Sequence, residues 1–184
     1  MKNKVILFFI FFLLTNPTEA KEEFVIMKLK DGEVQIELFS DVAPNHVKRF
    51  KQLISEKKYD GVIFHRVIEN FMAQTGDVKF GNSNNENYDL KRVGTGGSDY
   101  PDLKAEFSEL PHERGTLSMA RSSHPNSANS QFFICYTSTQ HLDRQYTVFG
   151  KVINGMEFID LIRKGEASDG RVTEPDKIIS LSLK

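Results

Sequence analysis

The sequence predicts a mainly β fold, either an antiparallel barrel or a sandwich. Many short runs of apolar and β-branched residues are separated by turn signals, and only two stretches have the spacing of an amphipathic helix. We find no internal repeat and no linker that would split the chain. We therefore expect one domain over residues 21–184, preceded by a leader over residues 1–20.

The leader has the pattern of a secretory signal peptide. Lys2 and Lys4 precede an apolar run over residues 5–14, and Thr18-Glu19-Ala20 provides a small-x-small cleavage site. The alternative is a membrane anchor, but a spanning helix needs roughly 20 apolar residues. We expect cleavage after Ala20, no stable membrane insertion, and a periplasmic location, with secretion or the endoplasmic reticulum lumen as alternatives.

The first elements of the domain are predicted to be a hairpin and a helix. Apolar runs at 24–29 and 34–39 flank Asp31-Gly32, which is a strong hairpin signal. Residues 40–59 follow with apolar side chains at helical spacing, and Pro44 suits the first turn of that helix.

The second half of the chain is predicted to hold four strands and one helix. The strands are expected at 117–120, 131–136, 147–152 and 178–183, and the helix at 155–164 with Asn154 as its cap. Residues 78–100 are rich in Asn, Gly and Ser and predict a long, solvated surface loop. Within this loop, residues 78–93 are either a solvated segment without a binding role or an element that selects protein clients.

The most informative stretch is 64–77, FHRVIENFMAQTGD, where a cation interrupts a strand-like run. Because an arginine is rarely buried without a partner, Arg66 must face solvent, an acid or a site. A two-residue turn at Glu69-Asn70 would pair Arg66 with Ala73 and place Gln74 on the opposite face. We therefore expect an irregularity between Phe71 and Gln74 if both polar side chains line one groove.

This stretch, together with SQFFI at 130–134 and VFGKV at 148–152, resembles the cyclophilin family of peptidyl-prolyl cis-trans isomerases. The resemblance extends from about residue 24 to residue 183. It implies a closed eight-stranded antiparallel β-barrel capped by two α-helices. It also implies an enzyme that rotates X-Pro peptide bonds without a cofactor or metal, with proline-containing segments of unfolded or folding proteins as its substrates.

The resemblance also assigns a site. Arg66 matches the catalytic arginine of the family. The residues that match its substrate-binding positions are Phe71, Met72, Gln74, Gly94, Ala120, Arg121, Ser122, Gln131, Phe133, His141, Leu142 and Tyr146. His141 stands where well-known eukaryotic members have tryptophan, and Tyr146 stands where they have histidine. Since that tryptophan contributes to cyclosporin binding, we expect weak cyclosporin binding here.

Other interpretations stay open at this point. The protein is expected to assist folding of exported proteins, but it could instead be a non-catalytic proline-peptide binding module or holdase that uses the same groove. Arg66 favours catalysis, because ground-state binding needs a pocket and no donor. Arg66 could also form a structural ion pair with Glu37, and the apolar site residues could be ordinary core.

Composition excludes several further classes. A formal net charge of −1 gives no reason to expect nucleic-acid binding. The single cysteine, Cys135, cannot form an internal disulfide, and the five histidines lack metal-ligand spacing. A Gly-x-Ser-x-Gly motif of a serine hydrolase is missing. We expect a monomer.

Overall fold

The computed structural model describes residues 23–184, so the expected signal peptide lies outside the described residues. Eight strands form one antiparallel sheet in the order β3-β4-β6-β5-β7-β2-β1-β8. The strands are β1 (Glu23–Lys28), β2 (Glu33–Leu38), β3 (Arg66–Ile68), β4 (Met72–Thr75), β5 (Thr116–Met119), β6 (Phe132–Cys135), β7 (Val148–Asn154) and β8 (Ser180–Leu183). The helices are α1 (Pro44–Ser55), the 3₁₀ helix η1 (Gln140–Leu142) and α2 (Met156–Asp160).

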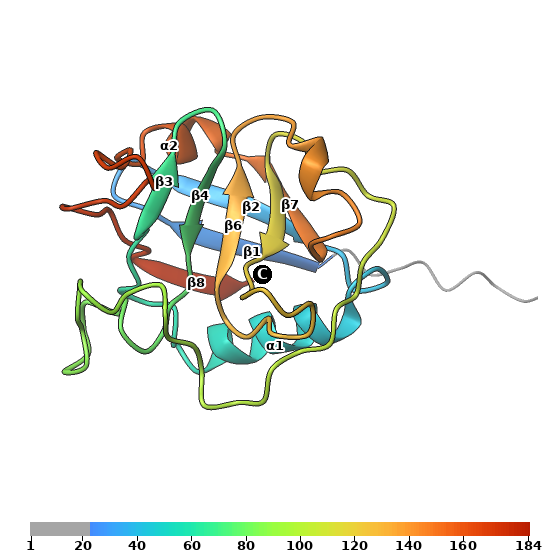
Figure 1. The fold of residues 1–184 in the computed structure, drawn as a ribbon, viewed down its shortest axis with the longest axis horizontal. Helices are drawn as coiled ribbons and strands as arrows, with labels where there is room; N and C mark the ends of the chain where they lie inside the picture. Colours follow the sequence, from blue (N-terminus) through green and yellow to red (C-terminus); the bar gives the residue numbers. More distant parts are fainter. Residues whose placement is uncertain (1–22) are drawn as a thin grey trace, which may run out of the picture.

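The sheet is strongly curled, with one α-helix at each end (Figure 1). β1 and β2 lie behind β3, β4 and β6, while α1 lies below the strands and α2 above them. The mainly β architecture with eight antiparallel strands and two α-helices is therefore confirmed. None of the helices within residues 23–184 has the length and apolar character needed to cross a membrane.

The first hairpin forms as predicted, and the helix after it is shorter than expected. β1 and β2 pair from Glu23↔Leu38 to Lys28↔Glu33. Helix α1 begins at Pro44 and ends at Ser55, four residues inside the predicted range at each end. Turns follow α1, and they include Lys57 with a positive φ of 55°.

The β3–β4 hairpin corrects the predicted turn. Arg66 pairs with Gln74 and Ile68 pairs with Met72, so the loop contains three residues instead of two. Its middle residue is Asn70, whose φ of 59° lies in the left-handed region that asparagine tolerates. The extra loop residue puts Arg66 and Gln74 on the same face, so the ladder is regular and the predicted irregularity is wrong.

The cap predicted for the second helix is also wrong. Asn154 is the last residue of β7 and pairs with Gln35. Gly155 precedes α2 with a φ of 87°, and a Cβ there would come within 2.5 Å of the Glu33 carbonyl oxygen. The chain therefore turns from strand to helix at a position that requires glycine.

The apolar residues form one large core and one small cluster. Four aromatic rings meet at the centre of the large core, from Phe50, Tyr59, Phe132 and Phe149, with centroids 5.2–6.2 Å apart. The small cluster contains Met72, Phe133, Cys135 and Leu142. Burial raises the pKa of the Cys135 thiol to about 11, so this side chain acts as a neutral apolar group.

Candidate active site

The small apolar cluster exists because β6 presents alternate side chains to opposite faces. Phe132 is fully buried in the large core, whereas Phe133 points to the other face of the strand. Phe133 pairs with Gln74 of β4, and Cys135 pairs with Met72. Cross-strand pairing therefore places apolar residues and an amide beside each other.

A cavity of about 140 Å³ opens over this cluster, and we call it the apolar cavity. Its walls come from β3, β4, the loop between them, β6, η1 and the segments after β5 and η1. The residues that line it are Arg66, Phe71, Met72, Gln74, Ala120, Arg121, Phe133, Leu142 and Tyr146. Nine of the residues predicted from the sequence thus meet at one place.

A second cavity of about 360 Å³ shares Gln74, Ala120 and Arg121 with the first, and we call it the polar cavity. It brings in three more predicted residues, Gly94, Ser122 and Gln131. The sequence did not single out its other lining residues, which are Thr95, Gly96, Gly97, Ser98, Asp102, Ser127 and Asn129.

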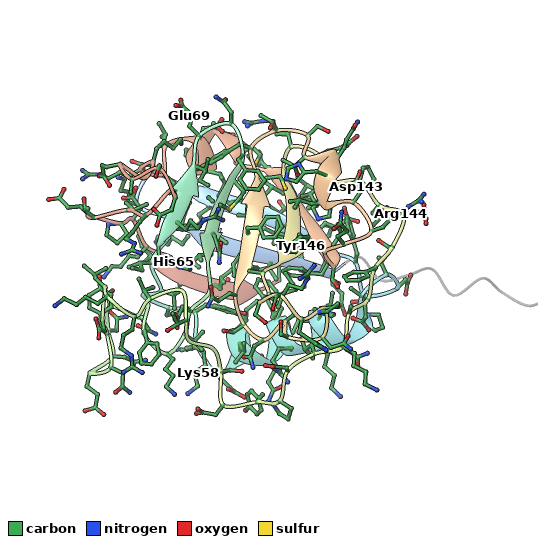
Figure 2. All side chains as sticks on the ribbon, in the orientation of Figure 1. Lys58, His65, Glu69, Asp143, Arg144 and Tyr146 are labelled. Atoms are coloured by element: carbon green, nitrogen blue, oxygen red, sulfur yellow. The ribbon has the colours of Figure 1, made fainter. Side chains whose placement is uncertain are left out.

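His141 is the one predicted site residue that lines neither cavity. Its exposed ring lies 5.6 Å from the ring of Phe71, at the outer side of the apolar cavity wall. Tyr146 lies inside the wall instead, where its ring meets Phe133 edge-on at 5.9 Å and the Arg121 guanidinium at 4.4 Å. Figure 2 shows Tyr146 and His65 on opposite sides of β4 and β6.

Arg66 is held at the mouth of the apolar cavity by neutral acceptors. Its Nε donates to the Asp169 backbone carbonyl at 2.9 Å, and Nη1 donates to Gln74 Oε1 at 3.3 Å. Within residues 23–184 neither Glu37 nor another carboxylate forms an ion pair with Arg66, and Nη2 has no hydrogen-bond partner. The guanidinium therefore keeps its charge uncompensated and one donor nitrogen free.

A chain of amide groups connects Arg66 to the glycine-rich loop. Gln74 Nε2 donates to Gln131 Oε1 at 3.1 Å. Gln131 Nε2 in turn donates to the carbonyls of Gly94 at 3.1 Å and Gly96 at 2.7 Å. Because each amide is held at both ends, the loop is connected to the arginine through two fixed side chains.

Asp77 anchors the same loop, a role that was not predicted from the sequence. The fully buried carboxylate accepts from the backbone N–H groups of Lys79, Phe80, Gly94 and Gly96 at 2.8–3.1 Å. Asp77 precedes Gly94 by 17 residues, so no local sequence pattern indicates this capture.

His65 lies under Gly94 and remains uncharged. Burial lowers the pKa of this histidine to about 4, and neither ring nitrogen has a hydrogen-bond partner within the described residues. A Cβ at Gly94, whose φ is 90°, would approach the His65 ring at 3.3 Å. The imidazole thus supports the rim of the polar cavity without adding a charge beside Arg66.

Comparison with known proteins agrees with this geometry. The pattern of the family described as "Cyclophilin type peptidyl-prolyl cis-trans isomerase/CLD" matches residues 24–183. The chain belongs to this family. Its activity is therefore peptidyl-prolyl cis-trans isomerisation, as the resemblance in the sequence implied.

Two bacterial relatives illustrate the similarity. A probable peptidyl-prolyl cis-trans isomerase of Brucella suis is 58% identical over 164 residues, which is 89% of this chain and 83% of that protein. A peptidyl-prolyl cis-trans isomerase of Acinetobacter baylyi is 38% identical over 183 residues, covering 94% of this chain and 91% of the relative.

Solved structures give the same family. A cyclophilin-type isomerase of Cryptosporidium parvum superposes with a TM-score of 0.76 at 29% identity, covering 89% of this chain and 98% of that chain. The same protein was also crystallised in the presence of the dipeptide Ala-Pro, and that structure gives a TM-score of 0.75 over 88% of this chain.

Proposed function

We propose that the apolar cavity receives the prolyl ring of an X-Pro segment and that Arg66 is the catalytic residue. The observation that carries this proposal is a guanidinium with a free donor nitrogen at the edge of an apolar cavity, held by neutral acceptors. The polar cavity lies next to it and offers hydrogen-bonding groups to the backbone of the same peptide.

The reaction needs no nucleophile, metal or proton transfer, because rotation breaks no covalent bond. The barrier of about 18–20 kcal/mol comes from amide resonance. A site that binds the twisted amide better than either planar isomer lowers this barrier. We infer that Arg66 donates a hydrogen bond to the imide nitrogen as its lone pair localises.

Arg66 cannot supply the whole effect. Acceleration by about five powers of ten requires roughly 7 kcal/mol, whereas a hydrogen bond from a charged group contributes roughly 1.5–3 kcal/mol. The remainder is assigned to removal of water from the amide in the apolar cavity and to clamping of the peptide backbone at Ala120, Arg121 and Ser122.

The experiment is two-dimensional exchange NMR on a short X-Pro peptide with the protein, with Arg66→Ala and with no protein. We expect the wild-type protein to raise exchange by several decades and Arg66→Ala to lose about 100-fold, equivalent to about 2.7 kcal/mol, while still binding. Arg171→Ala is the matched control, because Arg171 lies across an isolated bridge from Arg66 and outside the apolar cavity.

A second candidate is a proline-peptide binding module or holdase that uses the same groove. Peptide that binds without faster exchange would identify this function and overturn the catalytic role of Arg66. The free donor nitrogen of Arg66 favours catalysis, since ground-state binding of a prolyl ring needs only the apolar walls.

We also propose that the protein assists folding of exported proteins and acts in the periplasm. The support is the basic, apolar and small-residue pattern of residues 1–20. Uncatalysed X-Pro isomerisation takes tens of seconds and can limit the rate of folding. A catalyst of this step that needs no cofactor suits a compartment without ATP. Cell fractionation with N-terminal sequencing of the isolated protein tests this, and a cytoplasmic protein that starts at Met1 would refute it.

We further infer that the curled sheet functions as a closed barrel. The support comes from isolated bridges between Ile63 and Lys177 and between Arg66 and Arg171, which lie between the two ends of the strand order. Slow hydrogen exchange at the amides of Phe64 and Ile178, which bond across this seam, is the expected signature. Fast exchange at both would indicate an open sheet.

A further inference from the structure

Behind the apolar cavity, three side chains from separate segments form a Ser–His–Asp chain. His112 Nδ1 lies 2.9 Å from Asp143 Oδ1, and its Nε2 lies 2.9 Å from Ser118 Oγ. Both His112 and Ser118 are 0% exposed. Since a serine nucleophile must reach its substrate, this arrangement does not form a hydrolase site.

His112 instead contacts two walls of the apolar cavity. Its ring stacks on the back of Phe133, with centroids 6.1 Å apart and planes 16° apart. Its backbone N–H donates to Asp143 Oδ1 at 2.8 Å, and its carbonyl accepts from the Thr139 N–H at 2.8 Å. The segment 139–143, which carries Leu142, is thus attached to His112 at both ends.

We propose that His112 is a positioning residue that holds Phe133 and Leu142 in the arrangement that binds the prolyl ring, and that acid loosens this arrangement by exposing the His112 ring to water. The inference rests on the proposed function, because it assumes that the apolar cavity receives proline.

Counting hydrogens supports this role. With one proton on Nδ1, the His112 ring donates to Asp143, and the Ser118 hydroxyl must choose between His112 Nε2 and the Thr147 carbonyl oxygen at 3.1 Å. A second proton on the ring would satisfy all three hydrogen bonds. The balance between hydrogen bonding and burial therefore decides the charge of this histidine.

Burial has the larger effect and lowers the pKa of His112 below its ordinary value, although Asp143 acts in the opposite direction. The packed state then binds a proton more weakly than an exposed imidazole does. By linkage, falling pH favours states in which segment 139–143 has opened and the ring meets water. Activity should therefore fall on the acid side.

Other groups also face this histidine. Asp143 accepts two hydrogen bonds from His112, and these hold the pKa of its carboxyl below the usual range. Cys135 is kept neutral by burial, and Arg144 forms an ion pair with Glu109 beyond Asp143 (Figure 2). His141 is the other imidazole close to His112, so the experiment must separate the two histidines.

The test measures kcat/KM for an X-Pro peptide from pH 8 to pH 5, together with NMR titration of the His112 and Phe133 rings. For the wild-type protein we expect kcat/KM to fall with the same midpoint pH as the His112 titration, and we expect the Phe133 ring resonances to shift with that midpoint. His112→Phe keeps a flat ring against Phe133 and loses both side-chain hydrogen bonds. We expect it to raise KM about 10-fold at pH 8 and to abolish the acid-side fall.

His46→Phe is the matched control. His46 is also 0% exposed and lies 2.6 Å from a carboxylate oxygen of Glu106, but it belongs to α1. We expect this variant to lower Tm and to keep the acid-side fall of kcat/KM. An acid-side fall that persists in His112→Phe, or Phe133 resonances that do not follow the His112 titration, would overturn the proposal.

A second variant serves if His112→Phe does not fold. Asp143→Asn keeps an acceptor for the His112 backbone N–H and removes the charge that favours the protonated ring. In this variant we expect kcat/KM to begin its acid-side fall at a higher pH than in the wild-type protein. An unchanged pH profile of kcat/KM would count against the proposal. Failure of the proposed function is visible separately, as a wild-type protein that does not accelerate exchange at pH 8.

Discussion

The apolar and polar cavities share Gln74, Ala120 and Arg121 but are held in place by different interactions. The floor of the apolar cavity rests on the backbone ladder between β4 and β6. The rim of the polar cavity is made of loops held by side chains. Asp77 accepts from the backbone N–H groups of Lys79, Phe80, Gly94 and Gly96, and Asn129 accepts from Ser98.

This difference in support predicts how a substitution changes the structure of each cavity. In the apolar cavity the backbone is secured by strand pairing, so truncating a side chain opens space and leaves the backbone in place. In the polar cavity the backbone depends on single side chains, so removing one carboxylate releases a whole loop. Substitutions in the two regions should therefore change different observables.

The largest effect is expected from Phe133→Ala, which removes the wall of the apolar cavity. The folded state should lose about 3 kcal/mol of stability, and kcat/KM should fall about 100-fold, because the proposed proline site loses one of its apolar walls. Denaturant unfolding and exchange NMR measure the two quantities.

Phe132→Ala is the control for that variant. Phe132 is the preceding residue of β6 and faces the large core. The Phe132→Ala substitution should lower the free energy of unfolding at least as much, by roughly 3–5 kcal/mol. The molecules that remain folded should keep the wild-type kcat/KM. Equal losses of activity per folded molecule in the two variants would show that the faces of β6 are not functionally distinct.

A smaller effect is expected from Asp77→Ala. Four backbone N–H groups lose their acceptor, which should cost about 2 kcal/mol and speed hydrogen exchange at Gly94 and Gly96. Activity should fall about 10-fold, because the chain from the loop through Gln131 and Gln74 no longer orients Arg66.

Asp89→Ala provides the comparison for that loss. Asp89 also captures a backbone N–H, that of Lys91, but in an exposed part of the long loop. It should leave activity unchanged. If both variants behave alike, capture by Asp77 has no special role at the rim.

The smallest effect is expected from His141→Trp, which enlarges the outer wall beside Phe71 without touching either cavity. Cyclosporin affinity should rise about 10-fold, or about 1.4 kcal/mol, with little change in kcat/KM. Gln140→Trp, on the exposed face of the same short helix, should give no gain. A wild-type protein that already binds cyclosporin at nanomolar concentration would contradict the premise of weak binding.

Much of the fold was predictable because its signals are local. Asp31-Gly32 between apolar runs predicted the β1–β2 hairpin, and Pro44 predicted the first turn of α1. The helix ends were less predictable. Turns follow α1, and Gly155 takes the position before α2 because of contacts with Glu33, which lies far away in the sequence.

The sequence by itself indicated the nine residues that line the apolar cavity and three more of the polar cavity, because its motifs and the family they resemble point to them. It did not single out the other seven residues that line the polar cavity. Only the tertiary structure decided how the cavity residues are held. The three-residue turn at Asn70, the capture of Gly94 by Asp77 and the contact of His112 with Asp143 all depend on strand register or on segments that are distant in sequence. Periodicity reports the face of a residue within one element, whereas such contacts form only when separate elements pack.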